Sequence, residues 1–352
     1  MKMNCLELNE LADKLERERH LSKEEWVSLI DGVTPQSFEY IRQKADKIRQ
    51  SVYGKDVYIR GLIELTNYCK NDCLYCGIRR SNRNAERYRL GKEQILACCK
   101  TGYELGFRTF VMQGGEDAYY TDSVMCDIVS SIKAEYPDCA VTLSLGEKPY
   151  ETYRAYKDAG ADRYLLRHET ASKAHYEKLH PSEMSFDNRI RCLYDLKSLG
   201  FQVGSGFMVG SPCQTANELA EDMLFLEKLN PEMVGIGPFV PHHDTPFANE
   251  PGGTAEKTIL MVALTRILLP NALIPSTTAL GTIDPSGREK GILSGANVVM
   301  PNLSPTDVRS KYLLYDNKIC TGTEAAESLA ALKKQIGAIG YDIVVSRGDV
   351  KR

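Results

Sequence analysis

The sequence predicts a (β/α)8 barrel, and three features of the chain lead to this fold class. Short β-branched or apolar runs alternate eight times with longer segments of helical periodicity. Glycines separate many of them, as at Gly102, Gly160 and Gly200. The length of 352 residues suits a barrel with additions at both ends. An alternation this regular favours a closed parallel barrel over an open doubly wound sheet.

The first fifty residues precede the alternating pattern and have helical spacing throughout. Ser22 and Glu25 have the spacing of a capping box, and Thr34-Pro35 marks another helix start. We expect this extension, residues 1–50, to cover one end of the barrel. The barrel is expected over residues 51–322. Residues 323–352 are expected to form a C-terminal helix that ends near residue 339, followed by a frayed tail from residue 347.

Within the barrel, each predicted strand is followed by a predicted helix. The strands are expected at 57–65, 108–113, 140–145, 162–167, 201–206, 232–237, 272–277 and 296–300. The helices are expected at 92–105, 121–135, 149–159, 187–199, 214–229, 254–269, 286–290 and 305–314.

Composition excludes several classes of protein. Hydrophobic residues make up 43% and charged residues 26% of the chain, a globular profile without low complexity. The net charge of -3 argues against a nucleic-acid partner, and no polybasic segment suggests a membrane surface. The N-terminus lacks the apolar core of a signal peptide, and no apolar run approaches membrane-spanning length. We therefore expect a cytoplasmic protein.

Three cysteines, Cys69, Cys73 and Cys76, follow the first predicted strand with the spacing C-x3-C-x2-C. Thiolates this close can converge on one face of a cubic 4Fe–4S cluster, which usually takes four cysteines, so one iron would remain open to a substrate. A structural zinc site needs four ligands, and no second C-x2-C or H-x3-H is present. Zinc and no metal remain the less favoured alternatives. The eleven cysteines are an odd number, which argues against a disulfide framework, and Cys213 receives no role.

Function in such a barrel gathers where the strands end. The second strand ends in Gly114-Gly115-Glu116, where glycines allow close backbone approach and a carboxylate can accept from an ammonium group. An ordinary tight turn is the alternative. On the third strand, Thr142 and Ser144 share one face, so their hydroxyls point together into the barrel mouth or satisfy buried backbone.

The fourth strand ends with Arg167 and Glu169 on one face, which would place a cation and a carboxylate in the cavity. A structural salt bridge is the alternative, and His168 points the other way and is expected to be structural. Arg189 and Arg191, at the start of the next helix, are candidates for a carboxylate clamp, and two solvated surface arginines are the alternative.

Two later strand ends add further candidates. Thr277 and Thr278, at the end of the seventh strand, add hydroxyls on the substrate side. His242, His243 and Asp244 form a metal site only if adjacent histidines point the same way, which an extended chain does not allow.

These motifs together resemble the HydE family, the radical S-adenosylmethionine (SAM) maturases of [FeFe]-hydrogenase. The similarity runs in order from about residue 55 to residue 340, and several separate motifs carry it. They are the cysteine loop through Arg80, Val111–Asp117, Arg167–Thr170, Gly204–Gly210, Val234–Phe239 and Ala296–Asn302.

The resemblance implies a barrel in which SAM is cleaved reductively to a 5'-deoxyadenosyl radical. The radical would act in assembly of the di-iron subcluster, on an iron–carbonyl–cyanide–cysteine precursor delivered by HydG, with HydF and an electron donor as further partners. By position, the resemblance implies that the cluster would be held by Cys69, Cys73 and Cys76. The SAM amino group would lie near Gly114, Gly115 and Glu116, SAM would also contact Ser144 and Glu169, and its carboxylate would bind Arg189. The residues that would face the substrate are Arg167, Thr142, Thr277 and Thr278. No residue is assigned as a general acid or base.

Differences between this sequence and related radical SAM families limit the possible clusters and activities. Part of the family holds a second cluster through C-x7-C-x2-C, but here the frame that starts at Cys320 reaches Ser328 and Ala331, so we predict only one cluster. Biotin synthase needs cysteines on its barrel strands, where this chain has other residues. A methylornithine synthase-like or other small-molecule radical SAM enzyme remains an alternative. A non-catalytic iron–sulfur or zinc scaffold is a second one, although it has no need of Glu116, Glu169 and Arg189 at successive strand ends.

Overall fold

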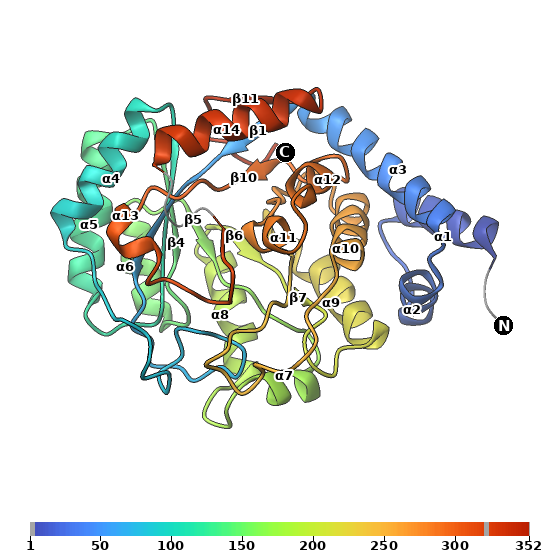
Figure 1. The fold of residues 1–352 in the computed structure, drawn as a ribbon, viewed down its shortest axis with the longest axis horizontal. Coiled ribbons are helices and arrows are strands. Elements are labelled where there is room, and N and C mark those ends of the chain that lie inside the picture. The colour runs from blue at the N-terminus through green and yellow to red at the C-terminus, as the bar shows by residue number, and fades with distance from the viewer. Residues whose placement is uncertain (1–3, 320–323, 352) are drawn as a thin grey trace.

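Eight parallel strand positions close a barrel in the computed structural model, which describes residues 4–319 and 324–351 (Figure 1). Six strands pair side by side in the order β2-β3-β4-β5-β6-β8. Parallel bridges complete the circuit, from Met233 to Leu273, from Pro275 to Val298 and from Leu62 to Asn302. The predicted closed barrel is therefore confirmed.

The elements mostly alternate along the barrel as expected. The strand predicted over 57–65 is divided at residue 60, and the one predicted over 272–277 forms only isolated bridges with described residues. Helices that were not predicted form at Lys173–Leu179 and Thr278–Ile283. The strands are β1 (Asp56–Ile59), β2 (Gly61–Thr66), β3 (Thr109–Gly114), β4 (Ala140–Ser144), β5 (Arg163–Leu165), β6 (Gln202–Ser205), β7 (Met208–Val209), β8 (Met233–Val234), β9 (Gly237–Pro238), β10 (Val298–Val299) and β11 (Asp342–Val344). The helices are α1 (Cys5–Glu18), α2 (Lys23–Gly32), α3 (Pro35–Tyr53), α4 (Lys92–Glu104), α5 (Asp122–Glu135), α6 (Tyr150–Asp158), α7 (Lys173–Leu179), α8 (Phe186–Ser198), α9 (Ala216–Leu229), α10 (Ala255–Leu268), α11 (Thr278–Ile283), α12 (Gly287–Ile292), α13 (Thr306–Arg309) and α14 (Ala325–Ala338).

The strand register places polar side chains inside the barrel. Val111 of β3 pairs with Thr142 of β4, and Thr142 pairs with Arg163 of β5, so these three side chains share the inner face. Their neighbours Phe110 and Leu143 point outward and are buried in the main hydrophobic core, beneath the helices. The interior is therefore suited to a polar ligand, while the helix layer holds the fold together.

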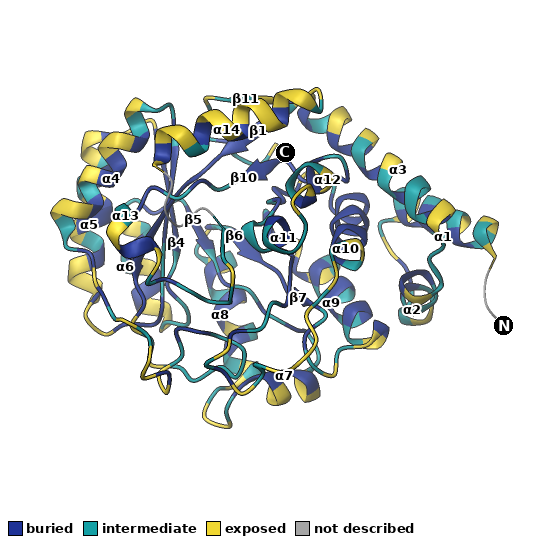
Figure 2. Ribbon diagram, viewed as in Figure 1, coloured by how far each residue is buried: buried dark blue, intermediate teal, exposed yellow. Residues whose placement is uncertain are grey.

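We expect from the sequence that the N-terminal extension covers one end of the barrel. In the structure it packs on the side of the barrel instead. Helix α3 packs on α10 and α2 packs on α9, along the outer wall (Figure 1). Every residue of α10 from Thr258 to Leu268 is buried, and Figure 2 shows α10 dark over most of its surface. A helix that is apolar all round needs cover on its outer face as well, and the extension provides it. The predicted capping box is present, since the Ser22 hydroxyl accepts from Glu25 N and the Glu25 carboxylate accepts from Ser22 N.

The helix expected over 305–314 is short, because α13 ends at Arg309. The chain beyond it bonds partly to itself, through Lys318 Nζ and Tyr312 O at 2.9 Å, and partly to distant elements. Leu314 O accepts from Gly77 N at 2.9 Å, and Lys318 Nζ lies 2.6 Å from the buried Glu64 carboxylate on β2. These contacts hold the segment across the mouth of the barrel.

The tail expected to fray from residue 347 is instead packed, in its described part, against the start of the barrel strands. Thr109 Oγ1 and Arg163 Nη2 both donate to Arg347 O, at 2.8 and 2.9 Å. The Asp349 carboxylate lies 2.6 Å from the fully buried Arg163 guanidinium and accepts from Gln202 at 3.0 Å. A buried arginine needs an acceptor, and the tail supplies one.

Replacing Asp349 by asparagine is expected to lower the free energy of unfolding by about 1–3 kcal/mol at neutral pH, less than for a fully buried pair because Asp349 is partly exposed. Burial by itself raises the pKa of Asp349, but hydrogen bonds from Arg347 and Gln202 and the charge of Arg163 bring that pKa below its usual 3.8. A carboxylate with a lowered folded-state pKa stabilises the protein above the unfolded pKa and loses that effect as pH falls.

Denaturant titrations at several pH values test this prediction. The difference between wild type and Asp349→Asn should be full above about pH 4 and shrink below it. Asp342→Asn, at an exposed position on β11, is the matched control and should leave stability within about 0.5 kcal/mol. An equal loss in both variants would contradict the role given to Asp349.

Among the described residues, no helix combines the length and apolar character that a membrane crossing requires.

Candidate functional site

The cysteine loop leaves the C-terminal end of β2 and is held by hydrogen bonds from side chains to its backbone. Arg87 donates to the carbonyl oxygens of Asn67, Ile78, Arg79 and Asn82. The Asp72 carboxylate accepts from Arg79 Nε at 2.8 Å and from Ser81 Oγ at 2.6 Å. These bonds fix the backbone of the loop that carries the three cysteines.

Cys69, Cys73 and Cys76 are free thiols at half-buried positions on this loop. Burial raises the pKa of Cys73 well above its usual value, and the nearby Cys76 and Cys69 raise it further. Burial likewise raises the pKa of Cys76 to about 12, with Cys69 as the next cause. Mutually interacting buried thiols ionise when a cation offsets the charge, so this donor set fits a metal cluster.

The Gly114–Glu116 turn, at the end of β3, packs directly on the cysteine loop. A Cβ atom at Gly115 would lie 2.2 Å from Tyr68 O and 2.7 Å from Cys69 Cβ, so only glycine fits. Lys70 N donates to Glu116 O at 2.9 Å, and Glu116 N lies 3.4 Å from Cys69 Sγ. The structure thus brings together two motifs that the sequence separates by about forty residues.

The Glu116 side chain is buried at this junction. Its carboxylate lies 2.9 Å from Lys70 Nζ and accepts from Glu147 N at 3.0 Å. Gly146 has a φ of +76°, and a Cβ atom there would lie 2.2 Å from Glu116 Cγ. The loop after β4 is therefore shaped around this carboxylate.

Arg189, on the first turn of α8, is buried and bonded within the protein. Its Nε donates to Glu147 Oε1 at 2.6 Å and its Nη1 donates to Arg167 O at 2.7 Å. Its Nη2 makes no hydrogen bond within the described part of the chain. Arg189 therefore has one donor group left for a ligand, whereas Arg191 is exposed and pairs with Asp195.

Arg167 and Glu169 lie together, as the strand pattern predicts. Arg167 Nη2 is 3.2 Å from Glu169 Oε2. Neither group is satisfied, because Arg167 Nε and Nη2, Glu169 Oε2 and the Thr142 hydroxyl are buried without a well-aligned hydrogen-bond partner among the described residues. Glu169 also has a φ of +66°, a strained value for a residue with a side chain. Unsatisfied buried polar atoms beside a strained backbone are typical of a ligand site.

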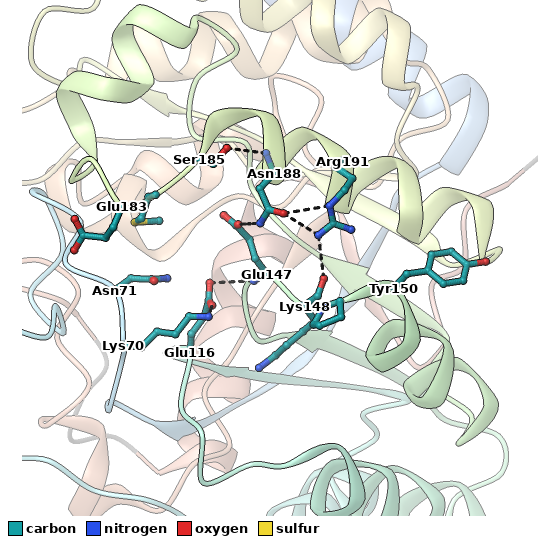
Figure 3. Close-up of a pocket in the computed structure, with 12 residues that line it drawn as sticks. Lys70, Asn71, Glu116, Glu147, Lys148, Tyr150, Glu183, Ser185, Asn188 and Arg191 are labelled. Atoms are coloured by element: carbon teal, nitrogen blue, oxygen red, sulfur yellow. Dashed lines mark hydrogen bonds and ion pairs between the residues drawn. The ribbon is translucent and has the colours of Figure 1, made fainter.

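A cavity of about 620 Å³ opens beside the cysteine loop (Figure 3). Glu147 lies between Glu116 and Asn188 in its wall, and Asn188 in turn accepts from Arg191. Of the predicted cofactor contacts, Glu116 alone lines this cavity. The predicted residues Ser144, Glu169 and Arg189 do not belong to its wall.

None of the four predicted substrate residues, Arg167, Thr142, Thr277 and Thr278, lines this cavity. The Thr277 hydroxyl caps α11 by accepting from Leu280 N at 3.3 Å. Thr278 lines a separate cavity of about 230 Å³ together with Asn302 and Lys318. Cys320 of the second-cluster frame lies outside the described residues, while Ser328 and Ala331 lie on α14 and line the same smaller cavity.

The two adjacent histidines do point the same way, which corrects our argument from an extended chain. The rings of His242 and His243 stack at 4.4 Å because the loop turns at this point, and both reach toward Asp316. However, His242 Nδ1 accepts from Asp244 N at 3.1 Å, so its Nε2 carries the proton in the neutral ring. That nitrogen has no lone pair for a metal, and the loop carries no metal role.

Sequence reasoning missed several residues that shape the site. Glu147 binds Arg189, and Met184 Sδ lies 3.7 Å from Cys73 Sγ. His180 Nε2 accepts from the Tyr75 hydroxyl at 3.1 Å, which fixes the residue between the second and third cysteines. The acidic position after Gly146 was the only sequence signal for Glu147, and Met184 and His180 had none.

The comparisons with known proteins agree with this geometry. The family model of the radical SAM superfamily matches residues 63–226. The chain is 48% identical over 332 residues, 94% of both chains, to the "[FeFe] hydrogenase maturase subunit HydE" of Thermotoga maritima. It is 27% identical to the 3-methylornithine synthase of Methanosarcina barkeri, over 90% of both chains. The crystal structure of methylornithine synthase (PylB) superposes with a TM-score of 0.82 at 24% identity and covers 95% of this chain and 97% of that one.

A closed parallel barrel with a three-cysteine loop against a glycine-glycine-glutamate turn defines a radical SAM enzyme, and membership implies a 4Fe–4S cluster and SAM. Within that superfamily, the chain belongs to the HydE family.

Proposed function

We propose that this protein cleaves SAM reductively to a 5'-deoxyadenosyl radical during assembly of the di-iron subcluster of [FeFe]-hydrogenase. The observation that carries the proposal is the packing of three free, mutually interacting thiols against the Gly114–Glu116 turn. The 48% identity over nearly the whole chain to a protein named as a hydrogenase maturase supports the particular substrate. The methylornithine synthase alternative has 27% identity in its favour and is the weaker candidate.

In this proposal Cys69, Cys73 and Cys76 hold a single 4Fe–4S cluster, because Ser328 and Ala331 offer no thiolate for a second one. Met184 lies against Cys73 and limits the access of water to that thiolate. The loop hydrogen bonds of Arg87 and Asp72 keep the three thiols in place. When bound, the cluster and SAM supply the radical chemistry, and the chain's residues supply position and shielding.

The remaining polar groups would orient SAM. Glu116, near Gly114 and Gly115, accepts from the SAM amino group, which replaces Lys70 Nζ as the partner of this carboxylate. The free Nη2 of Arg189 serves the SAM carboxylate, and Glu147 holds that arginine in place. Ser144 and Glu169 contact SAM on the barrel side, where Glu169 Oε2 forms an ion pair with Arg167 but accepts no aligned hydrogen bond from the described residues.

Arg167, Thr142, Thr277 and Thr278 would face the substrate, an organometallic precursor or another small molecule. The unpaired nitrogens of Arg167 suit an anionic or strongly polar group. HydG would supply the precursor, HydF would receive the product, and a separate electron donor would serve the cluster, all in the cytoplasm. Nucleic acid and membrane are not among the proposed partners.

Arg167→Ala is expected to leave the iron content unchanged and to weaken substrate binding about tenfold or more, because an unreplaced charged hydrogen bond contributes about 1.5–3 kcal/mol. The readout is the concentration of precursor that gives half-maximal maturation. Arg17→Ala, at an exposed arginine on α1 away from this cavity, is the matched control. An unchanged concentration in Arg167→Ala would refute the role.

An in vitro maturation tests the function itself. Apo-hydrogenase, HydG and HydF are combined with SAM and reductant, and the reconstituted protein replaces the usual HydE component. We expect hydrogen evolution with this protein and none with its Cys73→Ala variant. Cleavage of SAM without maturation, together with conversion of lysine to methylornithine, would instead favour the alternative.

A further inference from the structure

The segment that carries the cysteines is strongly basic in an otherwise acidic chain. Residues 68–89 contain six lysines and arginines against two acidic residues, a formal charge of +4, whereas the whole chain has a net charge of -3. Lys70 and Arg89 pair with Glu116 and Asp117 outside this segment, so the positive charge that faces solvent comes mainly from Arg80 and Arg83. Exposed positive charge attracts an oppositely charged partner and increases its rate of association.

This basic segment surrounds a hollow that reaches one of the three cysteines. The hollow has a volume of about 360 Å³ and is lined by Tyr68, Cys69, Arg80, Asn82, Arg83 and Arg87. We call it the arginine hollow. The cavity of about 620 Å³ on the other side of the loop has no cysteine in its wall. Cys73 is covered by Met184, and the loop after Cys76 by His242 and Leu314.

The arginines of the hollow divide into structural and available groups. Both terminal nitrogens of Arg87 donate to backbone carbonyls of the loop, four in total. Among the described residues, the Arg80 side chain contacts only Glu183, in an exposed ion pair at 3.1 Å, a kind of contact that contributes little. Arg83 is exposed and forms no ion pair or hydrogen bond with the described part of the chain. Arg80 and Arg83 can therefore meet an acidic surface without loss of a structural bond.

We propose that the arginine hollow is the docking surface for an acidic one-electron carrier protein, with Arg80 and Arg83 as its main contacts. The proposal rests on the proposed function, in which Cys69 is a cluster ligand. One electron leaves the carrier, which is oxidised, and enters the cluster, which is reduced, and no bond or proton is transferred in this exchange. A protein partner fits better than a small anion because Arg80 and Arg83 are both exposed, so their charges face solvent at the mouth of the hollow.

A charge-reversal pair tests the docking surface. Arg80→Glu/Arg83→Glu removes four positive charge units at the hollow, and Lys47→Glu/Arg154→Glu removes the same number from exposed positions on α3 and α6. Both are prepared as reconstituted and as cluster-free protein. The probe is an acidic plant-type 2Fe–2S ferredoxin, whose low reduction potential suits a low-potential acceptor.

The first readout is the dissociation constant of oxidised ferredoxin, measured by calorimetric titration at about 0.01 M and 0.15 M ionic strength. We expect Arg80→Glu/Arg83→Glu to weaken binding at least about tenfold at low salt, with a smaller difference at high salt, and the control to stay within about twofold. Unchanged binding in Arg80→Glu/Arg83→Glu, equal weakening in the control, or no ferredoxin binding to wild type would overturn the proposal. So would equally tight binding of an oligonucleotide with the same net charge.

The second readout separates docking from the proposed function. Dithionite, a small reductant, should reduce the cluster equally in all variants, while reduced ferredoxin should reduce Arg80→Glu/Arg83→Glu several-fold more slowly than wild type. A cluster that dithionite also fails to reduce would count against the proposed function. Equal rates with ferredoxin would count against the docking surface alone.

Discussion

Cys73→Ala is expected to leave the protein with less than one iron atom per chain, in place of about four, and to abolish SAM cleavage. Cys73 lies between the other two cysteines in sequence, and two thiolates cannot hold three irons of a cube. The loss of cleavage should exceed the ~10–100-fold effect seen when a group that only orients a ligand is removed. Iron and sulfide analysis after anaerobic reconstitution, with chromatography of 5'-deoxyadenosine, gives both quantities.

Cys213→Ala is the matched control, because Cys213 is exposed and lies on a loop away from the cysteine loop. It replaces one L-residue by another at the same positive φ of 64°, so it adds no backbone strain. Its iron content and SAM cleavage should equal those of wild type. Cleavage of SAM by Cys73→Ala, with the full iron content of wild type, would contradict the assignment of Cys73 as a cluster ligand.

Glu116→Gln is expected to weaken SAM binding by about tenfold to a hundredfold while the cluster still assembles. The amide keeps the shape of the side chain but not the charge that pairs with an ammonium group, a difference of about 1.5–3 kcal/mol. The backbone contact from Lys70 N to Glu116 O is unaffected, so the turn should keep its place on the cysteine loop. Equilibrium binding of SAM to the reconstituted protein measures the effect.

Glu183→Gln provides the comparison for Glu116→Gln, since Glu183 lines the same cavity but is exposed and pairs only with Arg80. SAM affinity should stay within about twofold of wild type in this variant. Equal affinities in Glu116→Gln and wild type would remove Glu116 from the SAM site.

The barrel could be predicted because each strand and helix carries its own periodicity. What could not be predicted depends on contacts between distant segments. Helix α10 is apolar on all faces, and only the structure shows that the N-terminal extension covers it. The chain after Arg309 carries a helical pattern, but its groups bond to Gly77 and Glu64 instead.

At the site too, residues with a local sequence pattern could be predicted, whereas contacts between distant segments could not. The Gly114–Glu116 turn was predicted from its residues and its place after a strand, and the structure packs it on the cysteine loop. Glu147 was not predicted as a partner of Arg189, because that pairing depends on how the loop after β4 meets α8. The roles of Ser144, Glu169, Arg189 and the three threonines toward SAM and substrate remain predictions.

Electron paramagnetic resonance of the reduced, anaerobically reconstituted protein, recorded with and without SAM, tests the central claim most directly. We expect about four irons per chain and one signal that changes when SAM is added, because a single cluster with an open iron binds SAM directly. Bound zinc, or a signal indifferent to SAM, would contradict it. Markedly more iron with a second signal would contradict the prediction of a single cluster.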